Sequence, residues 1–397
     1  MKVTGWLRLL AMAALLSAAC GTVKPQLAAN PIPSSSPTPF ASSAPSPVAT
    51  NSPTTKATPR STPKATPKPQ PNPCPPVQAP APVASNPNLA LVTLSGSGCV
   101  VVRDITDINH SKTISNLGLD LRPQFVSATA LSYIDAKRGL LRTPLSGSPR
   151  TPIAGGAGEF FTWSPDGKTA AYMSSRDNSG GGTTMQLHLV SGGKDRVVSS
   201  MPGLPSVFGC ESQACSDGWD FHLAYSPDGR FISWAQNVTD VVRMWTAGGR
   251  SVTLPNTFIQ KTVWSGPNFY FQDSKGIEVL RNGVVSTFLP RVTWIRPKAS
   301  PGGGQIVYET RDSSGVSRTH VVDTVTAKVR ELGTWRAEPA FLTPRFIWYQ
   351  GERLCTPNEC LPGSAIPTGK TYIYDLQTGT EAESIITSVA DVWPHAA

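Results

Sequence analysis

Cysteines are the residues of this chain best suited to chemistry, and the sequence contains seven. Six fall into three sets: Cys210 with Cys215, Cys355 with Cys360, and the remaining Cys74 with Cys99. An even number is typical of disulfides formed in an oxidising compartment. The alternative is a zinc site, but its cysteines are usually separated by two residues and accompanied by histidines. We therefore predict three disulfides, which leaves Cys20 for a different chemistry.

Other patterns that carry catalysis or ligand binding are absent from the sequence. The histidines are scattered along the chain without the spacing of metal ligands: His110, His188, His222, His320 and His395. The glycine runs 180–182 and 302–304 lack the Gly-Lys-Ser/Thr of a phosphate-binding loop, and no Gly-x-Ser-x-Gly nucleophile motif occurs. We predict no catalytic residue, no metal ion and no cofactor.

The amino terminus has the pattern of a secretory signal. Lys2 and Arg8 precede a short apolar run, residues 9–16, which is too short to span a bilayer. The small residues 17–19 before Cys20 resemble the lipobox of bacterial lipoproteins, in which the cysteine is joined to diacylglycerol and the preceding peptide is removed. An ordinary signal with an incidental cysteine is the alternative. The resemblance implies a signal peptide over 1–20 and a membrane anchor on Cys20, which places the protein in a bacterial cell envelope, at the cell surface or in the periplasm.

Residues 21–87 are dominated by Pro, Ser, Thr and Ala. Such a segment has too few large apolar side chains to offset the entropy of ordering, so we predict a disordered tether with local polyproline II conformation. An O-glycosylated stalk or a Pro-rich ligand for another domain is the alternative.

The basic charge of the chain is concentrated in its amino-terminal part. Of the formal net charge of +9, eight positive charges and no negative ones lie in residues 1–103, which leaves +1 for the remainder. A nearly neutral folded domain has no electrostatic attraction for a phosphate backbone. We therefore predict that the protein does not bind nucleic acid.

Beyond residue 88 the sequence repeats a pair of short apolar strands joined by a Ser-Pro-Asp-Gly turn. The two clearest turns are Ser164, Pro165, Asp166 and Gly167, and Ser226, Pro227, Asp228 and Gly229. Proline sets the first corner of such a turn, aspartate favours the second, and glycine adopts the positive φ that closes it. These turn residues are therefore interpreted as structural.

Fainter copies of the same pair begin near residues 125, 264, 299 and 341, at spacings of roughly 36 to 60 residues. Small sheets repeated at this period bury their faces against one another, which indicates an all-β β-propeller over 88–397. Residues 89–103 contain two further strands, and residues 388–393 contain a lone strand. Pairing of these two halves would close the ring as a seventh blade; six blades is the alternative.

The WSPDGK and YSPDGR units, residues 163–168 and 225–230, resemble the repeats of TolB-type propellers, a WD40-like (PD40) repeat. The resemblance covers about three quarters of the chain and implies a fold, because such propellers serve as scaffolds, lipoprotein modules and gating domains of peptidases. The sequence contains no clear α/β domain before the repeats and no hydrolase domain after them, so a Tol-system role is an analogy only.

Strand order in a four-stranded blade assigns the longest loops to one face. The Cys210–Cys215 loop joins two blades, and the Cys355–Cys360 loop joins a second strand to a third, as does the Gly-rich segment 175–183. We predict that this face carries the interaction surface, because long loops on a rigid scaffold often carry function. Its candidate residues are Phe208, Glu211, Trp219, Glu352 and Arg353. The alternative is that these loops are tolerated insertions without a function.

These observations favour a binding or scaffold module over an enzyme. The predicted partners are the membrane, through the lipid on Cys20, and an envelope protein, peptide or cell-wall glycan that the sequence does not identify. The alternatives are an enzyme with a dispersed active site in the propeller funnel, either a lyase or a hydrolase, and a structural or sensory accessory of an envelope complex.

Overall fold

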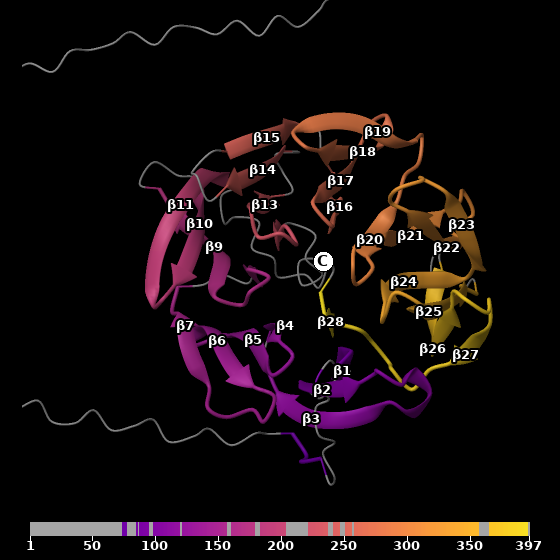
Figure 1. Cartoon of the computed structure of the whole chain (residues 1–397), viewed down its shortest axis with the longest axis horizontal. Coiled ribbons are helices and arrows are strands. Elements are labelled where there is room, and N and C mark those ends of the chain that lie inside the picture. Colours follow the sequence, from indigo (N-terminus) through magenta and orange to yellow (C-terminus); the bar gives the residue numbers. More distant parts are fainter. Residues whose placement is uncertain are drawn as a thin grey trace, which may run out of the picture. The chain divides into compact units, whose positions relative to one another are not determined.

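The computed structural model describes residues 74–77, 85, 87–94, 98–119, 121–156, 160–178, 183–203, 221–236, 241–246, 251–255, 258–356 and 365–395. All of them belong to one compact unit, residues 66–397. Within it, 28 strands form seven four-stranded antiparallel sheets arranged as the blades of a ring (Figure 1). The protein is therefore an all-β, seven-bladed β-propeller, and the alternative of six blades is wrong.

We number the blades 1–7 in chain order and give the strands of each from the centre of the ring outward. Blade 1 contains β4 (Leu121–Ser127), β5 (Ala130–Asp135), β6 (Gly139–Pro144) and β7 (Thr151–Ala154). Blade 2 contains β8 (Phe161–Trp163), β9 (Thr169–Asp177), β10 (Thr183–Ser191) and β11 (Lys194–Gly203). Blade 3 contains β12 (Phe221–Tyr225), β13 (Phe231–Gln236), β14 (Val241–Thr246) and β15 (Ser251–Pro255).

The remaining blades follow the same plan. Blade 4 contains β16 (Phe258–Ser265), β17 (Asn268–Asp273), β18 (Gly276–Arg281) and β19 (Val284–Pro290). Blade 5 contains β20 (Ile295–Ala299), β21 (Gln305–Arg311), β22 (Ser317–Asp323) and β23 (Val329–Thr334). Blade 6 contains β24 (Arg336–Phe341), β25 (Phe346–Leu354), β26 (Ala365–Asp375) and β27 (Glu381–Glu383).

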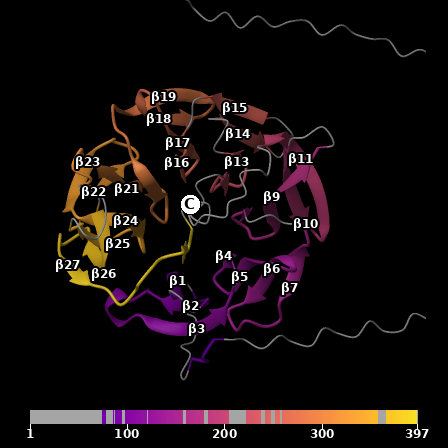
Figure 2. The same ribbon diagram turned by 180° about the vertical axis from the view of Figure 1, so that it is seen from behind.

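Blade 7 closes the ring with strands from both ends of the repeat region. It contains β28 (Asp391–Trp393), β1 (Leu89–Leu94), β2 (Cys99–Asp104) and β3 (Lys112–Gly118), with the short 3-10 helix η1 (Ile108–His110) before β3. Leu89 pairs with Trp393 and Leu91 with Asp391, and both views of the ring show β28 beside β1 (Figure 2). The predicted pairing of the two halves is confirmed, and it leaves β1 with a partner on both sides, β28 and β2.

The Ser-Pro-Asp-Gly turns are held by hydrogen bonds from their own serine and aspartate side chains, which also bond to backbone amides of the turn. The Ser164 hydroxyl donates to Asp166 Oδ1 at 2.6 Å and accepts from the Thr169 amide at 3.0 Å. Gly167 adopts a φ of +64°, and an added Cβ would lie 2.9 Å from the carbonyl oxygen of Val126 in the preceding blade. Only glycine meets both conditions without strain.

The hydrophobic core lies between blades rather than within one. Trp234 of blade 3 is fully buried and packs in one cluster with Leu187 and Leu189 of blade 2. Other clusters likewise join neighbouring blades, for example Tyr270 of blade 4 with Tyr308 of blade 5. Because each sheet buries both faces in this way, a blade has no core of its own.

A disulfide attaches the start of this unit to blade 7. Cys74 and Cys99 are bonded, and the Asn116 side-chain amide donates to the carbonyl oxygen of Pro75 at 3.1 Å. Contacts with the propeller therefore begin within the segment that the sequence analysis assigned to the tether. Cys355 is also disulfide-bonded.

Several sequence-based predictions lie outside the described residues. These are the signal peptide 1–20 with Cys20, most of the tether, and Cys210, Cys215, Cys360, Phe208, Glu211 and Trp219. Among the helices that the structure describes, none is long and apolar enough to cross a membrane.

Candidate functional site

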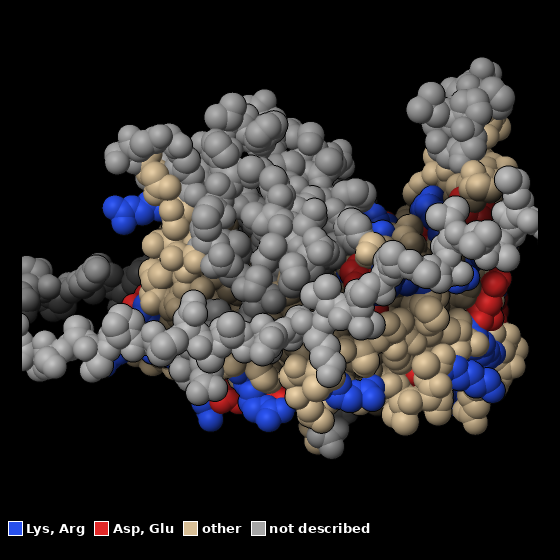
Figure 3. All heavy atoms as spheres, turned by 90° about the horizontal axis from the view of Figure 1, so that it is seen from above, with Lys and Arg blue, Asp and Glu red and all other residues tan. Residues whose placement is uncertain are grey.

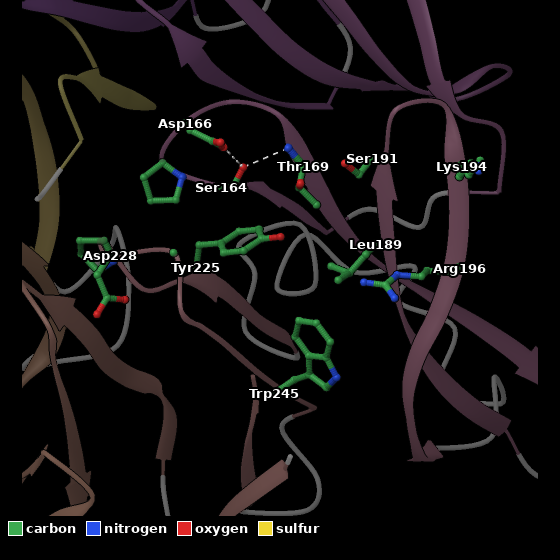
Figure 4. Close-up of a pocket in the computed structure, with 13 residues that line it drawn as sticks. Ser164, Asp166, Thr169, Leu189, Ser191, Lys194, Arg196, Tyr225, Asp228 and Trp245 are labelled. Atoms are coloured by element: carbon green, nitrogen blue, oxygen red, sulfur yellow. Dashed lines mark hydrogen bonds between the residues drawn. The ribbon is translucent and has the colours of Figure 1, made fainter. Parts of the chain in front are cut away.

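A pocket of about 720 Å³ opens between blades 2 and 3 (Figure 4). It lies on the face that carries the turns between first and second strands and between third and fourth strands, which we call the turn face. This is the face opposite to the predicted loop surface. The pocket is lined by Ser164, Pro165, Asp166, Thr169, Leu189, Ser191, Lys194, Arg196, Tyr225, Pro227, Asp228, Gly229 and Trp245. We call it the turn-face pocket.

Strand alternation determines which side chains face this pocket. Along β11, Lys194 and Arg196 line it, whereas Asp195 lies on the other side of the sheet, where it contacts Tyr172. Arg196 is paired across the sheet with Leu189 of β10, which also lines the pocket. Successive side chains of a strand point to opposite faces, so the sequence Lys-Asp-Arg directs two cations to one side.

Blade 3 contributes the other wall of the turn-face pocket. Tyr225 ends β12 just before a Ser-Pro-Asp-Gly turn, and Trp245 lies near the end of β14. The two turns touch, because an added Cβ on Gly229 would lie 3.4 Å from Pro165 Cδ. The pocket therefore has an apolar and aromatic wall between two rigid turns.

The two carboxylates at the pocket are engaged within their own turns. Asp166 Oδ1 accepts from the Ser164 hydroxyl and the Lys168 amide, and the first of these bonds is the main cause that lowers the pKa of Asp166. For Asp228 burial opposes ionisation, but bonds from Ser226 and Arg230 outweigh it and lower the pKa of that carboxyl. Both groups are therefore negatively charged at neutral pH.

The remaining polar side chains of the pocket are two cations, which only donate hydrogen bonds, and hydroxyls, which donate and accept. Burial, and then the negative charge of Asp166, raise the pKa of Tyr225 well above its usual range, so its hydroxyl keeps its proton. Lys194 and Arg196 are exposed, and no described carboxylate lies within 4 Å of either cation. The arrangement can bind a ligand through an apolar wall and free donors.

Glu352 and Arg353, the two predicted interaction residues that the structure describes, lie apart from this pocket on β25 of blade 6. The Glu352 carboxylate accepts from Arg311 of blade 5 at 2.8 Å, and Arg311 also contacts Glu309 at 2.8 Å. Glu352 thus joins two blades, whereas Arg353 is exposed on the loop side. The structural role of Glu352 follows from its buried side chain, which lies against Arg311 of the neighbouring blade. The residues next to Glu352 in the sequence do not indicate this position.

Ser174, His188 and Asp195 of blade 2 have the connectivity of a hydrolytic triad. His188 Nε2 lies 2.9 Å from the Ser174 hydroxyl and His188 Nδ1 lies 3.0 Å from Asp195 Oδ1. His188 also stacks on Tyr172, whose hydroxyl donates to the same aspartate. The sequence did not reveal this network, because its members lie on three different strands.

Two other blades contain parts of this network, which favours a structural role. In blade 5, His320 stacks on Tyr308 and lies 2.9 Å from the Thr310 hydroxyl. In blade 6, Tyr372 stacks on Tyr349, whose hydroxyl bonds to Glu381. A stacked aromatic pair with a hydroxyl or acid partner thus recurs in three blades, as expected of a packing feature, whereas a catalytic triad would also need an oxyanion site.

The network of blade 5 predicts a pH dependence of stability. Burial lowers the pKa of His320; Glu331 opposes this effect and Arg318 adds to it. A lowered folded-state pKa means that the unfolded chain binds the proton more readily, so stability is lost as the pH falls through about 6.5. We expect His320→Gln to lose less stability than the wild type between pH 7.5 and 5.5. Urea unfolding at both pH values measures this, with His110→Gln as an exposed control; equal losses in all three proteins would contradict it.

A second group of charges lies on the innermost strands. Lys298 of blade 5 interacts electrostatically with Asp391 of blade 7, although blade 6 lies between them. Desolvation by the surrounding protein lowers the pKa of Lys298, although its side chain keeps an exposed surface. Asp391 Oδ2 accepts from the Phe125 amide at 2.7 Å and lies 3.1 Å from His395 Nε2. In Figure 1, β28 lies toward the centre of the ring.

Charges of both signs are interspersed on the part of the surface that is coloured in Figure 3, in keeping with the near-neutral sequence beyond residue 103. The described residues contain no group of three or more His, Cys, Asp or Glu side chains that could hold a metal ion. The turn-face pocket is therefore the candidate ligand site of the described region.

Comparison with known proteins shows similarity of fold. No family model and no curated protein matches the sequence. Solved structures that are similar include TolB from Acinetobacter baumannii, at 16% identity and a TM-score of 0.42, covering 78% of this chain and 65% of that chain. A puromycin-hydrolyzing peptidase from Mycobacterium tuberculosis is 14% identical with a TM-score of 0.49, covering 76% of this chain and 53% of that one.

An oligogalacturonate lyase in complex with manganese is 12% identical with a TM-score of 0.46, covering 75% of this chain and 84% of that one. The chain spans less than two thirds of the length of the TolB and peptidase chains that it matches. Its assignment as a propeller follows from its own seven sheets.

Proposed function

We propose that this protein is a lipid-anchored, extracytoplasmic binding module that holds its ligand in the turn-face pocket. The observation that carries the proposal is the pocket itself, because an apolar wall combined with a few unpaired donors is the usual composition of a ligand site. Its volume of about 720 Å³ is sufficient for a small molecule or a few residues of a peptide.

Rigid turns are a suitable frame for such a site. The two Ser-Pro-Asp-Gly turns hold Asp166 and Asp228 in place through their own hydrogen bonds. Trp245, only 7% exposed, is held in the core between the blades. A ligand therefore meets preorganised groups, which lowers the entropic cost of binding.

The anchor completes the proposal. Lipidation of Cys20 would hold the protein at a membrane of the bacterial envelope, and residues 21–87 would extend the propeller away from it. The ligand is then an envelope protein, a peptide or a wall component. A Cys20→Ala variant should move from the membrane fraction to the soluble fraction.

Site-specific photo-cross-linking in cells tests where the ligand binds. A photoreactive side chain at Ser191 places the probe at the pocket, Val325 places it on the turn face of blade 5, and Arg353 places it on β25 at the loop side. We expect a reproducible adduct at Ser191 that Lys194→Trp abolishes, because Lys194 is an exposed residue of the lining at which a large side chain obstructs the pocket without disturbing the core. An adduct at Arg353 alone would move the binding site to the loop side, and adducts that Lys194→Trp leaves unchanged would overturn the proposed site.

An enzyme is the alternative, and the inner-strand residues Lys298, Asp391 and His395 are the observation that favours it. An amine whose pKa is lowered by desolvation and that interacts electrostatically with a carboxylate is a combination that proton-transfer sites use. Turnover of a wall-derived substrate that Lys298→Ala abolishes and Arg196→Gln preserves would support a lyase or hydrolase instead.

A further inference from the structure

We infer that the turn-face pocket recognises the terminal carboxylate of a peptide whose last side chain is apolar. This inference rests on the proposed binding function and names the ligand class of the same site. It follows from the hydrogen-bonding capacity, the charge and the wall of the pocket.

The two carboxylates of the pocket already have partners. Asp166 Oδ1 accepts two hydrogen bonds, and its Oδ2 lies 3.5 Å from Lys168 Nζ. Asp228 Oδ1 accepts from Ser226 and the Arg230 amide, and its Oδ2 accepts from Arg230 Nε at 2.6 Å. A ligand that must donate hydrogen bonds therefore competes with these partners for the carboxylates, or donates to neutral hydroxyls such as those of Thr169 and Ser191.

The charge of the pocket is positive once these pairs are formed. Asp166 with Lys168 and Asp228 with Arg230 are two neutral pairs. Lys194 and Arg196 then remain, and the described residues place no acid within 4 Å of them. The local formal charge is therefore positive, which favours an anion.

The free donors converge on one part of the pocket. Figure 4 shows the Tyr225 hydroxyl and the Arg196 guanidinium directed toward the same space beside Leu189. A guanidinium presents two parallel N–H groups that match the two oxygens of a carboxylate. Tyr225 stays protonated and can donate a third hydrogen bond to the same anion.

The wall of the pocket favours a ligand with an apolar side chain over a sugar. Leu189 and Trp245 are buried parts of the interblade core, so they offer an apolar surface and not an exposed aromatic platform. Recognition of sugar hydroxyls also needs acceptors, and the carboxylates here are occupied. An inorganic anion would leave the apolar wall uncovered. A carboxylate next to an apolar side chain, as at the end of a peptide, satisfies both requirements.

Titration of the purified full-length protein with matched peptides tests the inference. The probes are the tripeptide Ala-Ala-Leu with a free carboxylate and the same peptide with an amidated end, followed by calorimetry or tryptophan fluorescence. We expect the free acid to bind at least about tenfold more tightly than the amide, because one charge-assisted pair separates them. Arg196→Gln should abolish this preference, and Lys328→Gln, an exposed cation on the turn face of blade 5, should leave it unchanged.

Any other result of the peptide titration would contradict the inference. Equal affinity for acid and amide, no binding of the free acid at millimolar concentration, or a preference unaffected by Arg196→Gln would overturn it. Tighter binding of galacturonate or inorganic phosphate than of the peptide would assign a different ligand class. If Lys194→Trp still abolishes the Ser191 cross-link in any of these cases, the proposed binding function stands and only the ligand class is wrong.

Discussion

Ending the chain at Ser388, and so deleting β28, is expected to lower the free energy of unfolding by at least about 3 kcal/mol. The deletion removes Trp393, which packs against the cluster containing Leu89 and Leu91, and loss of one large packed aromatic alone costs about this much. It also removes Asp391, whose carboxylate accepts from the Phe125 amide of blade 1. Blade 7 would then have three strands, and the ring would be open.

Chemical denaturation measures the loss of stability, and size-exclusion chromatography with light scattering measures its second consequence. The exposed edge of β1 can pair with another chain, so we expect the truncated protein to self-associate. A chain ending at His395 keeps β28 and the contacts of His395 with Asp391 and Trp393, and it is the matched control because it removes only two residues. A truncated protein that stays monomeric with unchanged stability would show that closure through β28 does not hold the ring.

Arg311→Met is expected to destabilise the protein by about 3 kcal/mol at neutral pH. Arg311 lies between Glu309, which is 0% exposed at its side chain, and Glu352, which is 7% exposed. Removing the cation leaves two buried carboxylates without their partner, the situation in which a broken buried ion pair costs most. Arg311 itself is 34% exposed, so water screens part of the effect.

The pH dependence of this variant separates charge from packing. Burial already raises the pKa of Glu309 despite the opposing charge of Arg311. A raised folded-state pKa means that the folded state takes up protons first, so the deficit of Arg311→Met should shrink as the pH falls toward the ordinary glutamate range. A deficit that stays constant between pH 7.5 and 5 would attribute the loss to packing instead.

Two further variants complete this test by urea unfolding. Arg318→Met removes a cation from an exposed pair with Asp312 and Glu331, and we expect a loss below about 1 kcal/mol. Combining Arg311→Met with Glu309→Gln and Glu352→Gln removes the uncompensated charges and should restore most of the stability.

Features encoded in a few consecutive residues could be predicted from the sequence. The Ser-Pro-Asp-Gly turns depend on bonds between residues at most five apart, as from Ser164 to Thr169, so they follow from local chemistry. The blade count followed from their repetition and from two unpaired halves. The Cys74–Cys99 bond could be predicted because only these two cysteines remained after the close pairs were assigned. The structure contains this bond.

The site depends on contacts that no local pattern contains. Lys194 and Arg196 are ordinary strand charges in the sequence, and Trp245 is an ordinary strand aromatic. They become a pocket only because blades 2 and 3 pack side by side with Leu189 between them. Glu352 was predicted as an interaction residue but joins two blades instead, and the sequence could not indicate this because its partner Arg311 lies 41 residues away in another blade.

The sequence by itself determined the repeated blade, the closure of the ring and the position of Cys20 before a Pro-rich segment, because turn chemistry and strand periodicity act over short distances. The tertiary structure alone decided that the cavity lies on the turn face, that its carboxylates are paired and that two cations and a tyrosine hydroxyl supply its donors. Those properties arise from side chains of two sheets, and their free energies depend on which partners packing brings within hydrogen-bonding distance.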